Sequence, residues 1–118
     1  MKREIKFYKT KDGKCPVKEF IDTLPGKVAQ KIAWVLRLIE TQEKIPKTYF
    51  KNLTGTKIYE CRIEFSRNIY RILGQFYQGR FILLTNGFQK KTQKTPKDEI
   101  ELCNRRMADQ IKRGVMYE

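Results

Sequence analysis

Three strand-like segments follow one another with almost no chain between them, and this spacing constrains the fold more than any other feature of the sequence. Residues 57–65, 69–77 and 80–88 are rich in β-branched and aromatic side chains. Only residues 66–68 and 78–79 separate them. Connections this short join antiparallel neighbours, because a parallel crossover needs a much longer connection. The sequence therefore predicts an antiparallel meander.

Alternation within residues 57–65 gives this strand two different faces. One face is largely apolar and consists of Tyr59, Cys61, Ile63 and Phe65. The other face is mostly charged and consists of Ile58, Glu60, Arg62 and Glu64. We expect helices to cover the apolar face, which leaves the charged face open to solvent.

Helical patterns precede the meander. Pro16 suits the first position of a short helix, and Pro25 with Gly26 ends that helix and opens a longer one. The longer helix has a single apolar stripe, made of Val28, Ile32, Val35, Leu36 and Ile39. The two helices are consecutive and are therefore predicted to form a hairpin.

A third helix is expected near the C-terminus. Thr95 fits its N-cap, Pro96 its first residue and Asp98 the acidic position of a capping box. Apolar residues follow at helical spacing, namely Ile100, Cys103, Met107 and Ile111. This amphipathic helix either packs on the body of the protein or docks a partner.

The first strand is expected at residues 3–9, where apolar and polar side chains alternate. The predicted order is then β-α-α-β-β-β-α. We predict one α+β domain over residues 1–118, with an antiparallel sheet of about four strands, a two-helix hairpin on one face and a C-terminal helix. A chain of 118 residues has little room for a second domain.

The charge of the chain points to an anionic partner. There are 26 Lys and Arg residues against 13 Asp and Glu residues, a net charge of +13, which favours a polyanion such as nucleic acid. Residues 44–57 and 89–97 contain four lysines each and no acid, and both windows are predicted to be basic loops beside the sheet.

Residue types that are missing or scarce exclude several kinds of chemistry. The sequence has no histidine, which removes Ser-His-Asp, Cys-His and histidine-ligated metal sites. Its three cysteines are far apart and form neither a disulfide framework nor a metal knuckle. No long apolar run follows the basic N-terminus. We expect a cytoplasmic protein with no metal and no cofactor.

The strand arginines are the first candidates for a functional site. Glu60 and Arg62 on the charged face belong either to a cross-strand ion pair on a solvated sheet or to a phosphate clamp, in which Arg62 holds the phosphate and Glu60 orients it or takes a proton. Arg71 lies between Ile69 and Leu73 on a face that is otherwise apolar. Its side chain either reaches past the rim to water or forms a two-arginine anion site with Arg62.

A lysine cluster after the last strand is the other candidate. It comprises Lys90, Lys91, Lys94 and Lys97. Such a run is either a solvated loop or, at the end of a strand beside an open sheet face, part of a functional surface.

Several of these motifs together resemble a known family. They are Lys51-Asn52-Leu53, Ile58-Tyr59-Glu60-Cys61-Arg62-Ile63, Tyr70-Arg71-Ile72-Leu73 and the run from Gly87 to Pro96 with the letters GFQKKTQKTP. In this order they resemble the phage-derived Gp49-like, HigB branch of the RelE/ParE toxin superfamily. The predicted element order also matches the fold of that superfamily.

The resemblance implies the toxin of a type II toxin–antitoxin pair. Such toxins cleave messenger RNA, usually on the translating ribosome and without metal, and are held inactive by an antitoxin, here expected to be a helix-turn-helix protein like HigA. The resemblance places Arg62 and Arg71 around the scissile phosphate and Lys90 and Lys91 after the last strand. Where some members have a C-terminal Tyr or His, this chain has only Tyr117.

These considerations define an expected site. The expected catalytic residues are Glu60, Arg62, Arg71, Lys90 and Lys91, and the expected RNA-binding residues are Lys51, Lys57, Lys94 and Lys97. Two other functions stay open, a non-catalytic ParE-like toxin that binds DNA gyrase and a simple RNA-binding module.

Overall fold

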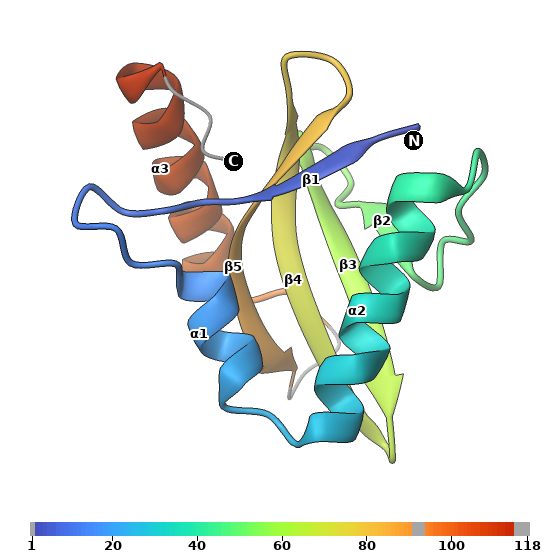
Figure 1. Ribbon diagram of the computed structural model, residues 1–118. Helices are drawn as coiled ribbons and strands as arrows, with labels where there is room; N and C mark the ends of the chain where they lie inside the picture. The colour runs from blue at the N-terminus through green and yellow to red at the C-terminus, as the bar shows by residue number, and fades with distance from the viewer. Residues whose placement is uncertain (1, 91–93, 115–118) are drawn as a thin grey trace.

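The computed structural model describes residues 2–90 and 94–114, which form a five-stranded sheet and three helices (Figure 1). The elements are β1 (Glu4–Phe7), α1 (Pro16–Asp22), α2 (Gly26–Thr41), β2 (Phe50–Asn52), β3 (Ile58–Phe65), β4 (Asn68–Tyr77), β5 (Phe81–Lys90) and α3 (Lys97–Arg113). The predicted RelE-like α+β class is confirmed.

The strand order is β1-β5-β4-β3-β2. The predicted meander is confirmed, because β3, β4 and β5 pair antiparallel. Its tight turns need left-handed backbone at Arg67, with φ 68°, and at Gly79, with φ 84°.

The prediction of an antiparallel sheet of about four strands was wrong in two respects. First, β1 pairs parallel with β5, with Ile5 opposite Ile82, so the sheet is mixed. The chain between them is long enough for this crossover because it contains both helices and the rest of the sheet. Second, β2 lies inside the 44–57 window that was predicted to be a loop. Only three residues pair there, too few for a period-two pattern to be visible.

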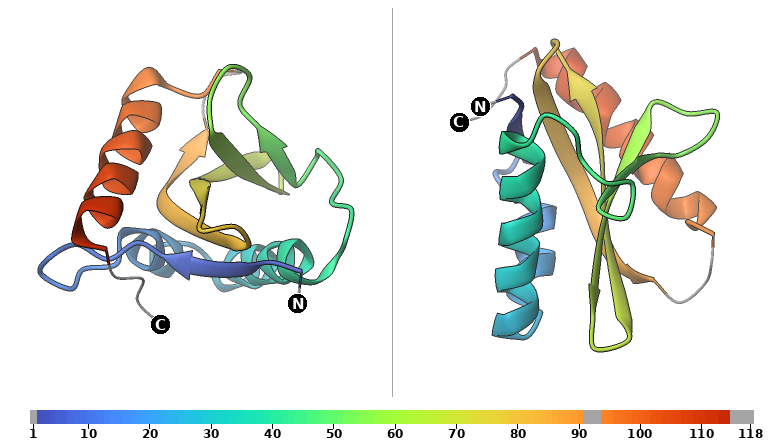
Figure 2. Two further views of the ribbon diagram at one scale, coloured as in Figure 1. Left: turned by 90° about the horizontal axis from the view of Figure 1, so that it is seen from above. Right: turned by 90° about the vertical axis from the view of Figure 1, so that its right-hand side faces the viewer.

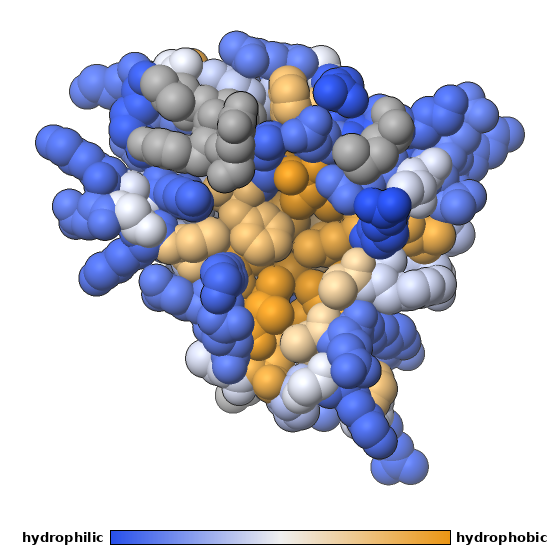
Figure 3. Space-filling model, in the orientation of Figure 1, coloured by the Kyte–Doolittle hydropathy of each residue, from blue (hydrophilic) through white to orange (hydrophobic). Residues whose placement is uncertain are grey.

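The sheet lies between helices on both faces (Figure 2). On one face α1 and α2 cover a core in which Val17, Ile32 and Val35 are fully or almost fully buried. Between these two helices, apolar side chains reach the surface and form an apolar strip with hydrophilic rims (Figure 3). The partly buried apolar residues of the two helices are Phe20, Ile21, Leu24 and Leu36.

Helix α3 packs on the other face of the sheet. Of the two alternatives for this amphipathic helix, packing on the body of the protein is therefore correct, and docking of a partner is not needed to cover its apolar stripe. Cys103 packs with Ile58 and Leu73, and Met107 with Leu83. The expectation that this face is open was therefore wrong for the part over β4 and β5, which α3 contacts. The apolar members of the face, such as Leu73, attract the apolar stripe of α3. On β3, Glu60 is buried as well, whereas the side chains of Arg62 and Glu64 are exposed in part.

The start of α3 differs from the predicted capping box. The helix begins at Lys97, with Pro96 as its N-cap residue and no side-chain cap hydrogen bond. The Thr95 hydroxyl instead donates a hydrogen bond to Glu60 Oε1 at 2.8 Å. In a cap the hydroxyl oxygen would accept from a backbone N–H, whereas here the hydroxyl donates to a charged acceptor, which makes a strong hydrogen bond. The loop before α3 is therefore attached to β3.

Within the described ranges 2–90 and 94–114, no helix has the length and apolarity needed to cross a bilayer.

Candidate functional site

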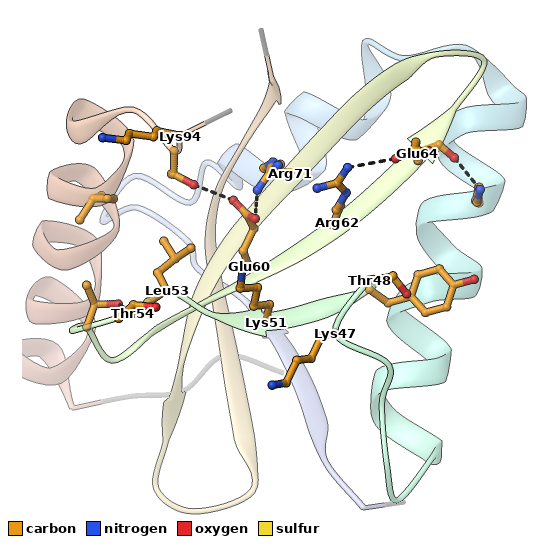
Figure 4. Close-up of a pocket in the computed structure, with 15 residues that line it drawn as sticks. Lys47, Thr48, Lys51, Leu53, Thr54, Glu60, Arg62, Glu64, Arg71 and Lys94 are labelled. Atoms are coloured by element: carbon orange, nitrogen blue, oxygen red, sulfur yellow. Dashed lines mark hydrogen bonds and ion pairs between the residues drawn. The ribbon is translucent and has the colours of Figure 1, made fainter. Parts of the chain in front are cut away.

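A groove of about 980 Å³ opens beside α3 and runs across β2, β3 and β4 towards α2 (Figure 4). Lys94, Leu53 and Thr54 lie on its α3 side, and Thr48 lies towards α2. The described lining includes six cationic side chains, those of Lys31, Lys47, Lys51, Arg62, Arg71 and Lys94. It includes two carboxylates, Glu60 and Glu64, so these groups give the groove a formal charge of +4. A groove of this sign concentrates anions.

Strand register brings the predicted arginines together. Arg62 on β3 is directly opposite Arg71 on β4, and Lys51 on β2 is directly opposite Glu60. All four side chains therefore share one face of the sheet. Like charges directly opposite each other in a sheet are destabilising, so the pair of arginines needs compensation from other groups.

Arg71 is compensated by Glu60 in a buried ion pair. The Arg71 guanidinium donates to Glu60 Oε2, and the two residues are only 5% and 3% exposed. Thr95 occupies the other carboxylate oxygen. Burial lowers the pKa of Arg71, but a guanidinium keeps its proton in proteins. Glu60 therefore holds and orients Arg71, and both of its oxygens are engaged.

One donor of Arg71 is still unused. Its Nε atom is buried in the wall of the groove and has no hydrogen-bond partner within the described part of the chain. A buried donor without an acceptor costs free energy, so the ion pair with Glu60, and not full satisfaction of its donors, holds Arg71 in place.

Arg62 is held much more loosely. Its side chain is 36% exposed and pairs with Glu64 at 3.0 Å, and Glu64 is itself 63% exposed. An exposed pair of this kind contributes little stability, so Arg62 can exchange Glu64 for another anion at small cost. The cross-strand ion pair is found for Glu60, which pairs with Arg71 on β4, but this pair is buried and not solvated. Arg62 pairs with Glu64 on its own strand.

Lys90, at the end of β5, is influenced by the same cluster. It is opposite Ile69 and therefore on the face that carries Arg71. Burial, followed by the charges of Arg71, Arg62 and Lys51, lowers the pKa of Lys90 to about 8. Near neutral pH a lysine with this pKa can both give and accept a proton.

The remaining predicted residues divide into three groups. Lys51 and Lys94 line the groove, as their assignment to RNA binding requires. Lys57 and Lys97 are exposed and do not line it, and the Lys97 side chain is 86% exposed with Glu101 at 4.0 Å. Lys91 lies outside the described residues, as does Tyr117.

Ten of the fifteen lining residues were not among the predicted site residues, and four of these ten lie towards α2. Lys47, Thr48 and Tyr49 come from the acid-free 44–57 window, and Lys31 comes from α2, where its ammonium donates to the Glu64 carbonyl oxygen. The only sequence signal for the first three was the charge of their window. Lys31 gave no signal, because a lysine on the polar side of a helix is ordinary.

The groove offers side chains for anions and few for metals. No group of three or more His, Cys, Asp or Glu residues is close enough to hold a metal ion, as far as the described residues show. Its polar atoms are mainly cationic donors, which fit phosphate oxygens.

The fold and the groove define a class, that of small RelE-like α+β proteins with a cationic groove beside the C-terminal helix. A sequence model of the phage-derived Gp49-like protein family matches residues 19–108. The chain belongs to this family, a family of RelE/HigB-type toxins. No curated protein sequence matches it.

The pKa of Lys90 provides a test of the geometry of the cluster. We expect Arg62→Gln to raise it from about 8 towards the ordinary 10.5, because one nearby cation is lost. NMR titration of the lysine side chains measures this shift. Arg37→Gln, on the exposed surface of α2, is the matched control and should leave Lys90 unchanged.

The same pKa has a consequence for stability. Because it is lower in the folded chain than in the unfolded chain, the unfolded chain holds the extra proton between pH 8 and 10.5. The contribution of Lys90 to the free energy of unfolding should therefore rise across that window. A Lys90 that titrates at 10.5 in every variant would contradict the arrangement of the cluster.

Proposed function

We propose that the protein is the toxin of a type II toxin–antitoxin pair and an endoribonuclease that cuts messenger RNA at the ribosome and thereby inhibits translation. The observation that carries the proposal is the cluster of Arg62, Arg71 and Lys90 on one sheet face. Membership in a family of RelE/HigB-type toxins supports it.

The proposed reaction is attack of the ribose 2′-oxygen on the adjacent phosphorus. The new bond forms as the bond from phosphorus to the 5′-oxygen breaks, which leaves a cyclic phosphate and a free 5′-hydroxyl. Negative charge builds up on the pentacoordinate phosphate in between. Fixed cationic donors such as Arg62 and Arg71 stabilise that charge, an effect worth several kcal/mol per well-placed donor. The fixed orientation of Arg71 beside Glu60 and the exchangeable pairing of Arg62 suit this role.

Proton transfer is assigned to Lys90. The 2′-hydroxyl must lose a proton and the 5′-oxygen must gain one. A lysine with a pKa of about 8 can serve in either step near neutral pH. The expected role of Glu60 as an alternative base is set aside, because Arg71 and Thr95 occupy both of its oxygens. Lys91 is kept as a second candidate for proton transfer.

Two features favour catalysis over the alternatives. A simple RNA-binding module needs only exposed cations, whereas this groove holds Arg71 in a buried, oriented position beside a lysine with a lowered pKa. The gyrase-binding alternative makes no use of either feature.

The proposed partner is an antitoxin of the HigA type, with a helix-turn-helix DNA-binding part. An acidic segment of this partner would suit the groove, where it would complement the charge of +4. The alternative surface is the apolar strip between α1 and α2 (Figure 3).

Arg62→Ala is the first test of the nuclease. Brief expression of the natural chain should create new 5′-hydroxyl ends inside translated codons, and the variant should lower their yield about 100-fold or more, as expected for loss of a transition-state donor. Mapping of transcript ends measures this. Arg62 is chosen because Arg71→Ala would leave Glu60 buried and unpaired, at a cost of about 3–5 kcal/mol in stability.

Arg37→Ala, away from the groove, is the matched control and should cut at the natural rate. Equal cutting by a folded Arg62→Ala variant would remove Arg62 from the site. Intact transcripts together with trapped gyrase would instead support the ParE-like alternative.

Salt dependence tests which lysines contact the RNA strand. A 2′-O-methyl oligonucleotide resists cleavage because it has no free 2′-hydroxyl, so its binding can be measured at several salt concentrations by fluorescence anisotropy. We expect Lys51→Gln and Lys94→Gln each to reduce the slope of log affinity against log salt by about 0.7. Lys57→Gln and Lys97→Gln are the controls, because these side chains do not line the groove. The same slope for all four variants would contradict this division.

A further inference from the structure

An exposed aromatic residue stands next to the groove and has no role in the chemistry described above. Trp34, on α2, is the only tryptophan of the chain, and it is 52% exposed. Its ring contacts that of Tyr49 edge to face, with the ring centres 5.6 Å apart. Such a contact uses only part of the indole surface, and the exposed fraction shows that much of it faces solvent.

Tyr49 connects this tryptophan to the proposed phosphate site. Its side chain lines the groove, and its carbonyl oxygen accepts a hydrogen bond from the Arg62 backbone nitrogen at 2.9 Å. Tyr49 is thus the backbone neighbour of Arg62 at the edge of β3. The aromatic pair therefore continues the groove from Arg62 towards α2.

Cations accompany the aromatic pair on both sides. Lys31 is three residues before Trp34 on α2, so both side chains lie on the same side of that helix. Lys31 lines the groove and reaches the Glu64 carbonyl oxygen on β3. Lys47 lines the groove two residues before Tyr49. Aromatic rings beside a cationic track are the arrangement by which proteins bind single-stranded nucleic acid, with rings for bases and cations for phosphates.

A structural role for Trp34 explains less of its surroundings. A tryptophan that served the core would be buried, as are its neighbours Ile32 and Val35. A role in the core also leaves unexplained why Trp34 contacts Tyr49, a residue that lines the cationic groove. We propose that Trp34, with Tyr49 packed edge to face against it, forms a stacking platform for one base of the RNA strand, next to the phosphate held by Arg62. This subsite rests on the proposed function in that it uses the same groove and the same ligand.

The platform makes a specific prediction about the kind of contact. Stacking uses the π-face that every base has, so the subsite should hold a base with little sequence preference. It should also be insensitive to salt compared with the lysine contacts, because stacking releases no counterions. The platform thus positions the strand, and the arginines act on its backbone.

Trp34 itself reports on the test. A 2′-O-methyl hexa-adenylate should quench the tryptophan fluorescence of the natural chain, whereas an abasic oligomer with the same number of phosphates should bind without quenching. Anisotropy of labelled oligomers then compares variants. Trp34→Leu keeps an apolar contact with Tyr49 but loses the π-face, and should weaken hexa-adenylate binding about fivefold or more while leaving abasic binding unchanged. Trp34→Phe should recover part of the loss.

Ile111→Ala is the matched control, because Ile111 is also an exposed apolar residue, 57% exposed, and lies on α3. It should bind both oligomers like the natural chain. Circular dichroism melting confirms that each variant is folded, and quenching of the natural chain decides the question even if Trp34→Leu is unstable.

Three results would overturn the platform. The first is absence of quenching by hexa-adenylate, and the second is equal weakening of hexa-adenylate and abasic binding in Trp34→Leu. The third is unchanged binding of both oligomers in that variant. This third result would leave the indole as a contact for a protein partner. Because these experiments measure binding alone, they are independent of cleavage. Quenching without RNA cleavage would refute the nuclease and keep the platform, and cleavage without quenching would do the opposite.

Discussion

Two arginines face each other across neighbouring strands, and the rest of the groove is organised around this unfavourable pairing. The register of β3 and β4 places Arg62 opposite Arg71, where like charges repel. Two carboxylates on β3, on either side of Arg62, compensate the charges of the two arginines. Glu60 pairs with Arg71, and Glu64 pairs with Arg62. Thr95 then fixes Glu60 from the loop before α3. Glu60 thus connects the sheet, the second arginine and the start of the last helix.

The two ion pairs differ in burial, and this difference divides the proposed roles. Arg71 is buried and oriented, so it presents its donors in a fixed geometry, which is what stabilisation of a developing charge requires. Arg62 is partly exposed and can exchange its carboxylate for a phosphate. Burial, together with the charges of Arg71, Arg62 and Lys51, lowers the pKa of Lys90 and fits it for proton transfer. In the proposed mechanism the partly buried cationic cluster therefore serves both anion binding and acid–base chemistry.

Local patterns predicted the elements well, and long-range contacts accounted for the errors. The meander, α1 and α2 follow from short turns and periodicity, and the placement of Arg62 and Arg71 on one face follows from them. The parallel pairing of β1 and the short strand β2 depend on partners distant in sequence, which no local pattern contains. The local pattern predicted that Thr95 caps a helix. That prediction failed because Thr95 bonds instead to Glu60, which is 35 residues away in the sequence and is not part of the local pattern. Lys57 shows why not every site residue could be predicted. The charge of the 44–57 window does not tell which of its lysines point into the groove, and Lys57 does not line it.

In the proposed reaction, RNA is cut by its own 2′-oxygen under the influence of this cationic cluster. The most direct measurement uses translating ribosomes programmed with a defined message, in which a single ribose immediately before the cut is replaced by deoxyribose. We expect the all-ribose message to be cut to a cyclic phosphate end and the substituted linkage to stay intact. Continued cutting at the deoxyribose would require a different nucleophile and would refute the proposed reaction.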